Sequence, residues 1–305
     1  MEIIQDNEEM QNSQLESDTA CIGTFDGMHL GHQELLKHTY IIGAGKYTVV
    51  TFNELPQKTL KDKNYKYMIN KLDREKLLMA QHATVVIYFD FEIIKDLDPS
   101  NFCKKLNEKY GINKIVVGED FKFGKDRTGD IEFLKGYFND NNVSVVPNKL
   151  VNGSKVSSSS IRDYLMKGDI NFVNKLMGRN YSITGVVIYG NGVGTKLGFP
   201  TANLDIDKNY RLPKNGVYAV TVVLESSNDE YSGMVNIGFR PTLGSTSNSL
   251  NIEVNIFNFD SSIYGERLTL KFNNFLREEK KFNTLDDLSK QLSKDKSAAI
   301  KNLNI

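Results

Sequence analysis

The chain has 305 residues, and 38 Lys and Arg residues balance 38 Asp and Glu residues, so its formal net charge is zero. This balance argues against a broad basic surface for nucleic acid or an anionic membrane. Two cysteines exclude a disulfide framework and a cysteine-rich metal site, and the chain lacks an apolar run long enough to predict a membrane span. The length is typical of two domains. Residues 1–18 contain acidic side chains and no Lys or Arg, unlike a signal peptide, so we expect a cytoplasmic protein.

The first half alternates apolar strands with helical segments. After a short edge strand expected at residues 1–4, apolar runs predict buried parallel strands at residues 19–22, 47–52, 84–89, 114–118 and 143–146. Apolar periodicity predicts helices over residues 33–40, 72–82 and 99–109, the last with Ser100 as its N-cap. This alternation predicts a doubly wound, Rossmann-like α/β sheet that binds ligands at the carboxyl ends of its strands.

The second half has a different pattern of apolar and turn-forming residues. Strand-like runs separated by Gly, Asn, Pro and Ser turns occupy residues 183–188, 217–224, 231–237, 250–257 and 267–272. Because no long helical pattern interrupts them, they predict a small antiparallel barrel or sandwich. Residues 285–303 return to a helical period and predict a C-terminal helix packed on this unit. We therefore predict an α/β domain over residues 1–180 and an all-β domain over residues 181–305.

The first motif reads GTFDGMHLGH, from Gly23 to His32, and lies between the first interior strand and a helix. Glycines there allow backbone amides to approach a phosphate, and a helix N-terminus favours an anion. His29 and His32 can both donate hydrogen bonds to phosphate oxygens. A zinc site is a weaker interpretation because no third ligand lies nearby in the sequence. A glycine-rich turn with two incidental histidines is also a weaker interpretation, since the chain has only four histidines and two of them lie here.

A second motif, residues 190–203, reads GNGVGTKLGFPTAN and follows a predicted strand. Composition alone makes it as consistent with an ordinary turn as with a phosphate-binding loop. Further along, Asn251, Glu253 and Asn255 form one polar face of the predicted strand over residues 250–257. The pattern by itself favours a solvent-facing role for that face.

Together these motifs resemble those of the bacterial bifunctional riboflavin kinase/FAD synthetases. In the first half the resemblance rests on GTFDGMHLGH, on VGEDFKFG at residues 117–124 and on SSSSIR at residues 157–162. In the second half it rests on GFPTAN, PKNGVYA, NIGFRPT and LREEKKF. It covers the chain from about residue 20 onward. It implies a nucleotidylyltransferase domain followed by a barrel kinase domain, ATP as co-substrate, Mg²⁺ as cofactor, and riboflavin, FMN, FAD and ADP as the other ligands.

For the first domain, the resemblance implies adenylylation of FMN. His29 and His32 would hold the ATP phosphates, and Arg162 would clamp the departing pyrophosphate. Asp120 would orient a substrate, and serine hydroxyls would bind phosphate. The implied substrate contacts are Gly23, Thr24, Phe25, Asp26, Gly27, Asp120, Ser158 and Ser159. Considered alone, the serine run is more typical of a helix cap, and Asp120 of a solvated loop carboxylate.

For the second domain, the resemblance implies phosphorylation of riboflavin. Glu253 would accept the proton of the 5′-hydroxyl, and Thr201 and Asn203 would bind Mg²⁺ through neutral oxygens. Arg277 would stack on, or hydrogen-bond, the flavin. Contacts to ATP are implied for the loop residues Gly190, Gly192, Gly194, Lys196, Gly198 and Pro200.

The sequence departs from the family pattern at three places. Ser159 replaces a usual Thr, and TFNELP at residues 51–56 lacks the histidine and one proline of a usual Phe-x-Pro-His-Pro run. Thr195 stands where Arg is frequent, and the neighbouring Lys196 could supply the charge. Two alternatives therefore remain open: an adenylyltransferase whose barrel only binds flavin, and a flavin-binding regulatory protein without turnover.

Overall fold

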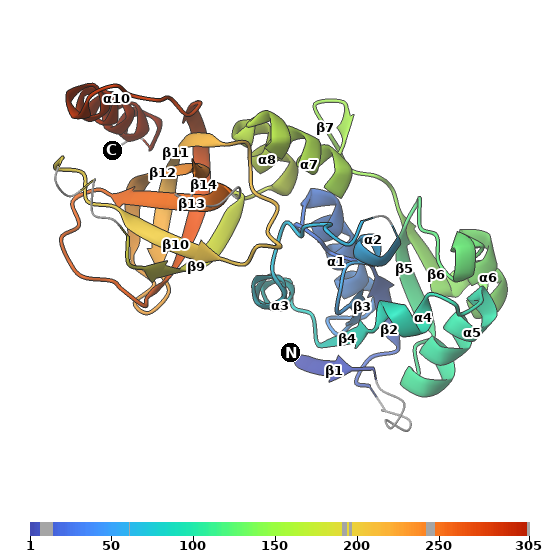
Figure 1. Cartoon of the computed structure of the whole chain (residues 1–305). Helices are drawn as coiled ribbons and strands as arrows, with labels where there is room; N and C mark the ends of the chain where they lie inside the picture. The colour runs from blue at the N-terminus through green and yellow to red at the C-terminus, as the bar shows by residue number, and fades with distance from the viewer. Residues whose placement is uncertain (7–14, 61, 191–193, 195–196, 242–247, 304–305) are drawn as a thin grey trace. The chain divides into compact units, whose positions relative to one another are not determined.

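Figure 1 shows the computed structural model, which describes residues 1–6, 15–60, 62–190, 194, 197–241 and 248–303. The side chains of residues 239–249 also lie outside the described part. The chain folds into two compact units, Met1–Ser158 and Ser159–Ile305, each built around a sheet of its own. The domain boundary predicted between residues 180 and 181 stays a prediction.

A six-stranded parallel sheet forms the centre of the first unit and confirms the predicted α/β class. Its strands, in spatial order, are β1 (Glu2–Gln5), β4 (Val85–Phe89), β3 (Thr48–Phe52), β2 (Thr19–Ile22), β5 (Lys114–Gly118) and β6 (Val143–Val146). The short strand expected at the N-terminus is present as β1, at one edge of the sheet. The strands read as continuous apolar runs because helices cover both faces of the sheet.

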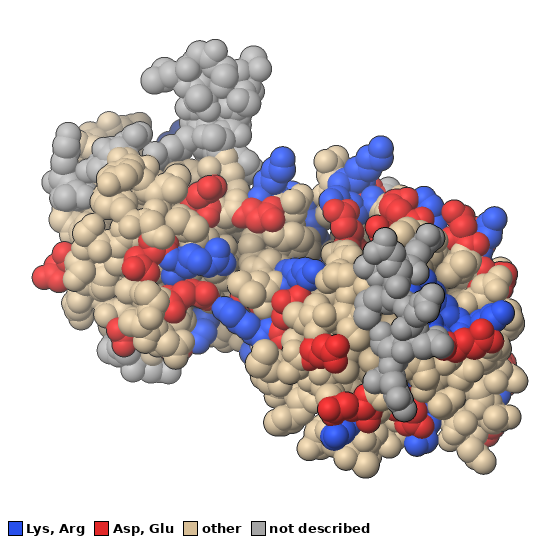
Figure 2. Space-filling view, turned by 90° about the horizontal axis from the view of Figure 1, so that it is seen from below, with Lys and Arg blue, Asp and Glu red and all other residues tan. Residues whose placement is uncertain are grey.

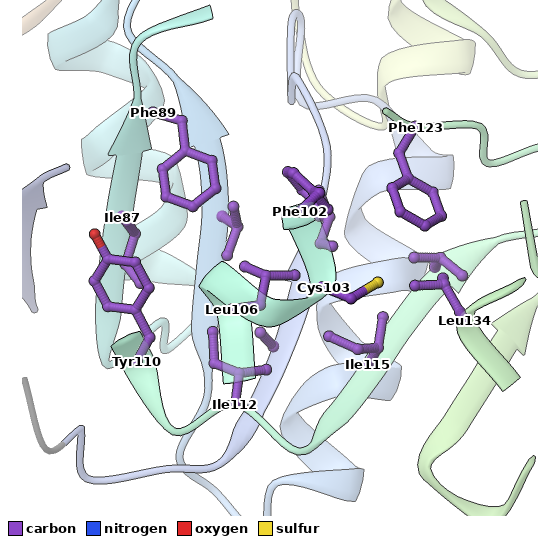
Figure 3. Packing of buried hydrophobic residues seen from close by; sticks show 14 of the residues in the cluster. Ile87, Phe89, Phe102, Cys103, Leu106, Tyr110, Ile112, Ile115, Phe123 and Leu134 are labelled. Carbon is purple, nitrogen blue, oxygen red and sulfur yellow. The ribbon is translucent and has the colours of Figure 1, made fainter. Parts of the chain in front are cut away.

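Successive residues of the central strands enter two different cores. In β4, Ile87 and Phe89 face one core, while Val86 and Tyr88 face the other. Helices α5 (Pro99–Lys104) and α6 (Ile131–Phe138) contribute Phe102, Cys103, Leu134 and Phe138 to the first core, part of which Figure 3 shows. Helices α1 (Leu30–Ile42) and α3 (Lys71–Ala80) contribute Leu35, Leu36 and Leu78 to the second. The layers are therefore helix, sheet and helix.

Short elements complete the first unit. They are α2 (Pro56–Leu60), α4 (Phe91–Ile94), the π-helix η1 (Lys105–Lys109), the 3-10 helices η2 (Lys125–Arg127) and η3 (Asp140–Asn142), and the hairpin of β7 (Leu150–Val151) and β8 (Ser154–Lys155). The helix predicted over residues 99–109 thus consists of α5 and a π-helical turn. Its predicted N-cap, Ser100, was wrong: the Asp98 carboxylate accepts the Asn101 N–H at 2.9 Å. Asp98 is the N-cap because Pro99 is the first residue of the helix. Proline lacks an amide N–H, and at this position that N–H would have no partner within the helix.

A closed six-stranded antiparallel barrel forms the second unit and confirms the predicted all-β architecture. Its spatial order is β10 (Ala202–Ile206), β13 (Asn248–Ile256), β12 (Glu230–Pro241), β11 (Gly216–Leu224), β14 (Arg267–Arg277) and β9 (Ser182–Ile188). β10 was not predicted from the sequence. The predicted C-terminal helix is α10 (Leu285–Leu303), which packs on β11, β12 and β14 around Met234 and Ala299.

Two further helices, α7 (Ser158–Lys167) and α8 (Ile170–Met177), precede the barrel in the sequence. α8 packs against β14 and buries Val173, Leu176 and Met177. Within the described ranges, no helix combines the length and the apolar character that a membrane crossing needs.

Candidate active sites

The loop between β2 and α1 is folded by backbone conformations that are unusual for its residue types. Phe25 and Met28 both have positive φ angles, 50° and 45°, and Gly27 has a φ of 85°. The Asp26 carboxylate accepts the Met68 N–H at 2.8 Å, and the Ser158 hydroxyl donates to the Asp26 carbonyl at 3.1 Å. Strained backbone held by buried contacts is a frequent feature of functional sites. Here it brings His29 to the N-terminus of α1.

His29 and His32 form a stacked pair at the start of α1. Their ring centroids are 3.6 Å apart with an interplanar angle of 13°, and His29 Nδ1 accepts the His32 N–H at 3.3 Å. In its neutral form His29 therefore carries its proton on Nε2, which can donate to a ligand. Gly31 permits this arrangement, since a Cβ there would lie 3.3 Å from the His29 ring.

Burial keeps both imidazoles neutral. Burial lowers the pKa of His29 to about 4, and burial together with the nearby His29 lowers the pKa of His32 well below 6.5. His32 Nδ1 is buried and has no hydrogen-bond partner among the described residues. A neutral pair of N–H donors at a helix N-terminus is suited to a highly charged phosphate chain, because it adds hydrogen bonds without further buried charge.

The depressed pKa of His29 predicts a pH-dependent stability. The unfolded chain binds a proton near pH 6.5 but the folded chain only near pH 4, so stability is complete above about pH 6.5 and falls as the pH decreases. At about pH 5 the linkage relation gives a loss of about 2 kcal/mol from this residue. Thermal unfolding of wild type and of His29→Asn, which keeps an acceptor for the His32 N–H, checks this. The variant should lose less stability between about pH 7 and pH 5; equal losses would contradict the assignment.

A cavity of about 730 Å³ opens beside the histidine pair, at the carboxyl ends of the parallel strands. One wall is aromatic: Phe52 and Phe91 meet edge to face at 5.7 Å, and Phe121 and Phe123 stack at 5.5 Å. The remaining lining includes the cationic side chains Lys95, Lys122, Lys125, Arg127, Lys149 and Lys155. Flat aromatic surfaces beside cations and neutral N–H donors fit a ligand with a planar ring system and phosphate groups.

The structure brings six of the predicted residues of the first domain to this cavity: Gly23, Thr24, His29, His32, Asp120 and Ser158. Asp120 is exposed and pairs with Lys155 at 2.7 Å. Ser159 and Arg162 lie on α7 in the second unit, so their contacts to phosphate stay predictions.

Phe25, Asp26 and Gly27 are not among the residues that line the cavity. Phe25 is fully buried, and its ring lies 5.3 Å from that of His32. Asp26 is 3% exposed and holds the Met68 amide. Phe25 thus packs beside His32, whereas Asp26 holds the loop to Met68, and a direct contact of these residues with substrate stays a prediction.

The barrel contains a second cavity, of about 420 Å³. Glu253 on β13 lies opposite Asn203 of β10 on one side and Asn236 of β12 on the other. Thr201 and Asn255 line the same cavity. The polar face of β13 is therefore directed into a cavity at Glu253 and Asn255, contrary to the solvent-facing role that its pattern alone favours. The reason is that α10 and the segment before it cover this face, since Leu288, Leu292 and Glu279 line the same cavity.

The glycines of the 190–203 motif allow close packing inside the barrel unit. A Cβ on Gly190 would overlap the Asn203 amide, and one on Gly194 would overlap the Phe199 carbonyl. Gly198 has a φ of 79°, which favours glycine. Of the predicted ATP contacts, Gly194 lines the cavity, whereas Gly190, Gly198 and Pro200 lie outside its lining. Gly192, Thr195 and Lys196 lie outside the described residues.

Arg277 lines this cavity but is also bound to α10. Its Nε and Nη2 donate to the Asp295 carboxylate at 2.9 and 2.7 Å, and Nη1 donates to the Glu278 carbonyl at 2.8 Å. The Asp295 side chain is only 4% exposed and also accepts from Gln291 at 2.8 Å. A bidentate pair of this kind fixes both orientation and distance. Arg277 therefore attaches α10 to the barrel, and its contact with flavin stays a prediction.

We expect Asp295→Asn to destabilise the barrel unit by roughly 2–4 kcal/mol, because it leaves a mostly buried guanidinium without its counter-ion. Denaturant unfolding measures this effect. The double variant Arg277→Met/Asp295→Leu should recover most of the loss, since it removes both charges. A single variant as stable as wild type would show that the pair does not hold α10.

Sequence reasoning missed several cavity residues. Gln57 lines the first cavity, and its Oε1 is buried without a partner among the described residues. Glu279 lines the second, and a Cβ on Gly238 would overlap its carboxylate. Asn236 and Asn255 also lie there. For Asn255 the alternating polar face was an available signal, whereas for Gln57 and Glu279 no local pattern points to a cavity.

Comparisons with known proteins agree with this division into two sites. A family model described as FAD synthetase matches residues 11–160, and one described as riboflavin kinase matches residues 177–303. A bifunctional riboflavin kinase/FMN adenylyltransferase of Buchnera aphidicola subsp. Schizaphis graminum is 36% identical over 294 residues, which is 93% of each chain. A protein of the same name from Bacillus subtilis is 34% identical over 290 residues, 92% of this chain and 91% of that one.

A crystal structure of a Streptococcus pneumoniae protein is also similar over almost the entire chain. It has a TM-score of 0.88 and 30% identity, and the match covers 98% of this chain and 99% of that one. It is named as a macrolide-efflux protein, and that name applies to the streptococcal protein alone. The two family models and the extended sequence identity support one conclusion: the chain belongs to the family of bifunctional riboflavin kinase/FMN adenylyltransferases.

Proposed function

We propose that the two reactions of the family are divided between the two cavities. The barrel cavity phosphorylates riboflavin with ATP to give FMN, and the cavity at the histidine pair joins FMN to the adenylyl group of ATP to give FAD. The observation that carries this division is that each compact unit has its own cavity, and that every lining residue of each cavity belongs to one unit.

In the adenylyl transfer, an oxygen of the FMN phosphate attacks the α-phosphorus of ATP, and pyrophosphate leaves. No bond to the protein forms, so catalysis depends on positioning and on stabilising negative charge. His29 and His32 donate to the phosphate oxygens from the start of α1, and the aromatic wall at Phe52 and Phe91 accommodates the flavin ring. Arg162, Ser158 and Ser159 are the proposed binding groups for the departing pyrophosphate.

In the phosphoryl transfer, the riboflavin 5′-hydroxyl attacks the γ-phosphorus of ATP, and ADP leaves. Glu253 orients the hydroxyl and accepts its proton. Asn203 and Asn236, its neighbours across the strands, keep the carboxylate in a polar environment. Gly194 and the adjoining loop are the proposed contacts of the ATP phosphates.

The residues of the barrel cavity also fit Mg²⁺. Thr201 provides a hydroxyl, Asn203 an amide oxygen and Glu253 a carboxylate, and oxygen donors of these types are those that Mg²⁺ prefers. When bound with ATP, Mg²⁺ would neutralise charge on the phosphates. Thr201 and Asn203 would hold it, while Glu253 keeps its role at the substrate hydroxyl.

An incubation with riboflavin, and a parallel one with FMN in its place, test this function. Protein, riboflavin, ATP and Mg²⁺ are mixed, and the flavins are separated by chromatography. We expect FMN to appear first and FAD to follow. Accumulation of FMN without FAD would indicate an inactive first site, and conversion of added FMN but not of riboflavin would indicate a barrel that only binds flavin. Absence of both products would favour a flavin-binding protein without turnover.

We further propose a cytoplasmic protein that acts on free nucleotides and flavins, without nucleic acid or membrane partners. In support, Cys21 and Cys103 are both free thiols. Acidic and basic side chains are interspersed over the face in Figure 2.

A further inference from the structure

Asn255 has a specific structural contact inside the kinase cavity. It lies on β13, two residues after Glu253 and on the same face, and it is only 5% exposed. Its Nδ2 donates to the Pro200 carbonyl at 2.7 Å. The hydrogen bond connects the wall that carries Glu253 with the segment that leads into β10.

The contact lies where the pairing of β10 with β13 begins. The ladder pairs Ala202 with Val254 and Asn203 with Glu253, and it does not extend to Pro200. Proline has no N–H to donate, so a ladder cannot continue in the usual way through that residue. The Asn255 amide supplies a hydrogen bond that the backbone there does not make. Thr201 thus lies between two fixed points: the Pro200 carbonyl and the paired Ala202.

The other side of the same corner is packed against the glycine loop. A Cβ on Gly194 would overlap the Phe199 carbonyl and would lie 3.2 Å from Thr201 Oγ1. The corner from Phe199 to Thr201 is therefore confined by Gly194 and by Asn255. With its backbone held in this way, Thr201 lines the cavity together with Asn203 and Glu253.

We propose that Asn255 is a positioning residue of the kinase site. It acts through the Pro200 carbonyl to hold the Thr201 hydroxyl in place for the Mg²⁺–ATP phosphates. The inference rests on the role proposed above for Thr201. It implies that loss of the Asn255 donor weakens the use of ATP while the riboflavin side of the cavity is little changed.

Steady-state kinetics of the full chain test the proposal. For Asn255→Ala we expect kcat/KM for ATP in FMN formation to fall roughly tenfold, because the Pro200 carbonyl loses the hydrogen bond that fixes the corner before Thr201. The KM for riboflavin should stay near its wild-type value. Asn251→Ala, on the same face of β13 but outside the cavity lining, is the matched control. Conversion of added FMN to FAD by the same preparation reports on the other site.

Two further variants separate positioning from simple packing. In Asn255→His the Nδ1 atom lies the same number of bonds from the backbone as the asparagine Nδ2, so it can donate to Pro200 and should restore the use of ATP. Asn255→Asp keeps the size but has no proton to donate when ionised, so it should remain impaired.

Several results would overturn the inference. They are an Asn255→Ala enzyme indistinguishable from wild type or from Asn251→Ala, an Asn255→Asp enzyme as active as Asn255→His, and equal losses for ATP and riboflavin. A wild-type protein that forms no FMN would instead overturn the proposed kinase function, so the two failures are distinguishable.

Discussion

Glu253→Gln is expected to reduce FMN formation from riboflavin by roughly 10²–10⁴-fold, the range over which a positioned general base contributes. Glutamine keeps the size of the side chain beside Asn203 and Asn236 on the neighbouring strands, but it cannot accept the proton of the 5′-hydroxyl. Conversion of added FMN to FAD should be unchanged, because no residue of the first cavity is altered. Initial rates with riboflavin and with FMN, measured on one preparation, provide the comparison.

Glu230→Gln is the matched control for this variant. Glu230 also lies in the barrel, but it pairs with Lys271 on the surface and is half exposed, so its replacement should leave both rates near wild type. A Glu253→Gln enzyme that forms FMN at the wild-type rate would exclude Glu253 as the base. A loss of both activities would show that the substitution disturbs more than the kinase site.

His29→Ala and His32→Ala are each expected to reduce FAD formation from FMN by roughly 10²–10³-fold, comparable to the loss of one preorganised hydrogen-bond donor to a transition state. The double variant should be no more active than either single variant, and its loss need not equal the product of the two, because the stacked rings act as a unit. FMN formation from riboflavin should persist. Single-turnover formation of FAD and pyrophosphate measures the effect.

His38→Ala is the matched control, because His38 lies on the same helix α1, outside the cavity lining, and pairs with Glu34 at the surface. It should retain FAD formation. If His38→Ala were as impaired as His29→Ala, the loss would reflect the stability of α1 rather than contacts with phosphate.

The architecture was largely predictable because the sequence patterns that indicate it lie within short segments of the chain. Buried parallel strands read as apolar runs, and the change to short strands with turn residues marks the barrel. The histidine pair was predictable for the same reason, since spacing along one chain segment places His29 and His32 together at a helix start. β10 was missed because residues 202–206 form a short run interrupted by two polar residues, of which Asn203 lines the cavity and lies against Gly190.

Side-chain direction was less predictable than position. Phe25 and Asp26 belong to the correct loop, but their backbone turns them inward, and no local pattern encodes a positive φ at a phenylalanine. Arg277 was placed in the correct cavity, yet its partner Asp295 lies on a helix brought near only by the folded barrel. Local patterns indicate the residue types near a site, whereas the partners of those residues depend on long-range packing.

The glycine loop also shows that a local sequence pattern does not reveal which residues pack against it in the fold. Its glycines suggested close approach to a phosphate, which stays a prediction, and in the fold Gly190 and Gly194 also lie close to Asn203 and Phe199. Both residues that they accommodate border the kinase cavity. The glycines thus shape the site by allowing its polar side chains to pack closely against the loop.

The division of labour between two independent sites is tested most directly by mixing two variants, each of which lacks one of the two activities. Glu253→Gln alone should not convert riboflavin, and the His29→Ala/His32→Ala double variant should stop at FMN. Mixed together with riboflavin, ATP and Mg²⁺, they should form FAD, because FMN released by one protein is adenylylated by the other. Failure of the mixture to form FAD, when each variant retains its single remaining activity, would contradict two separate sites that exchange free FMN.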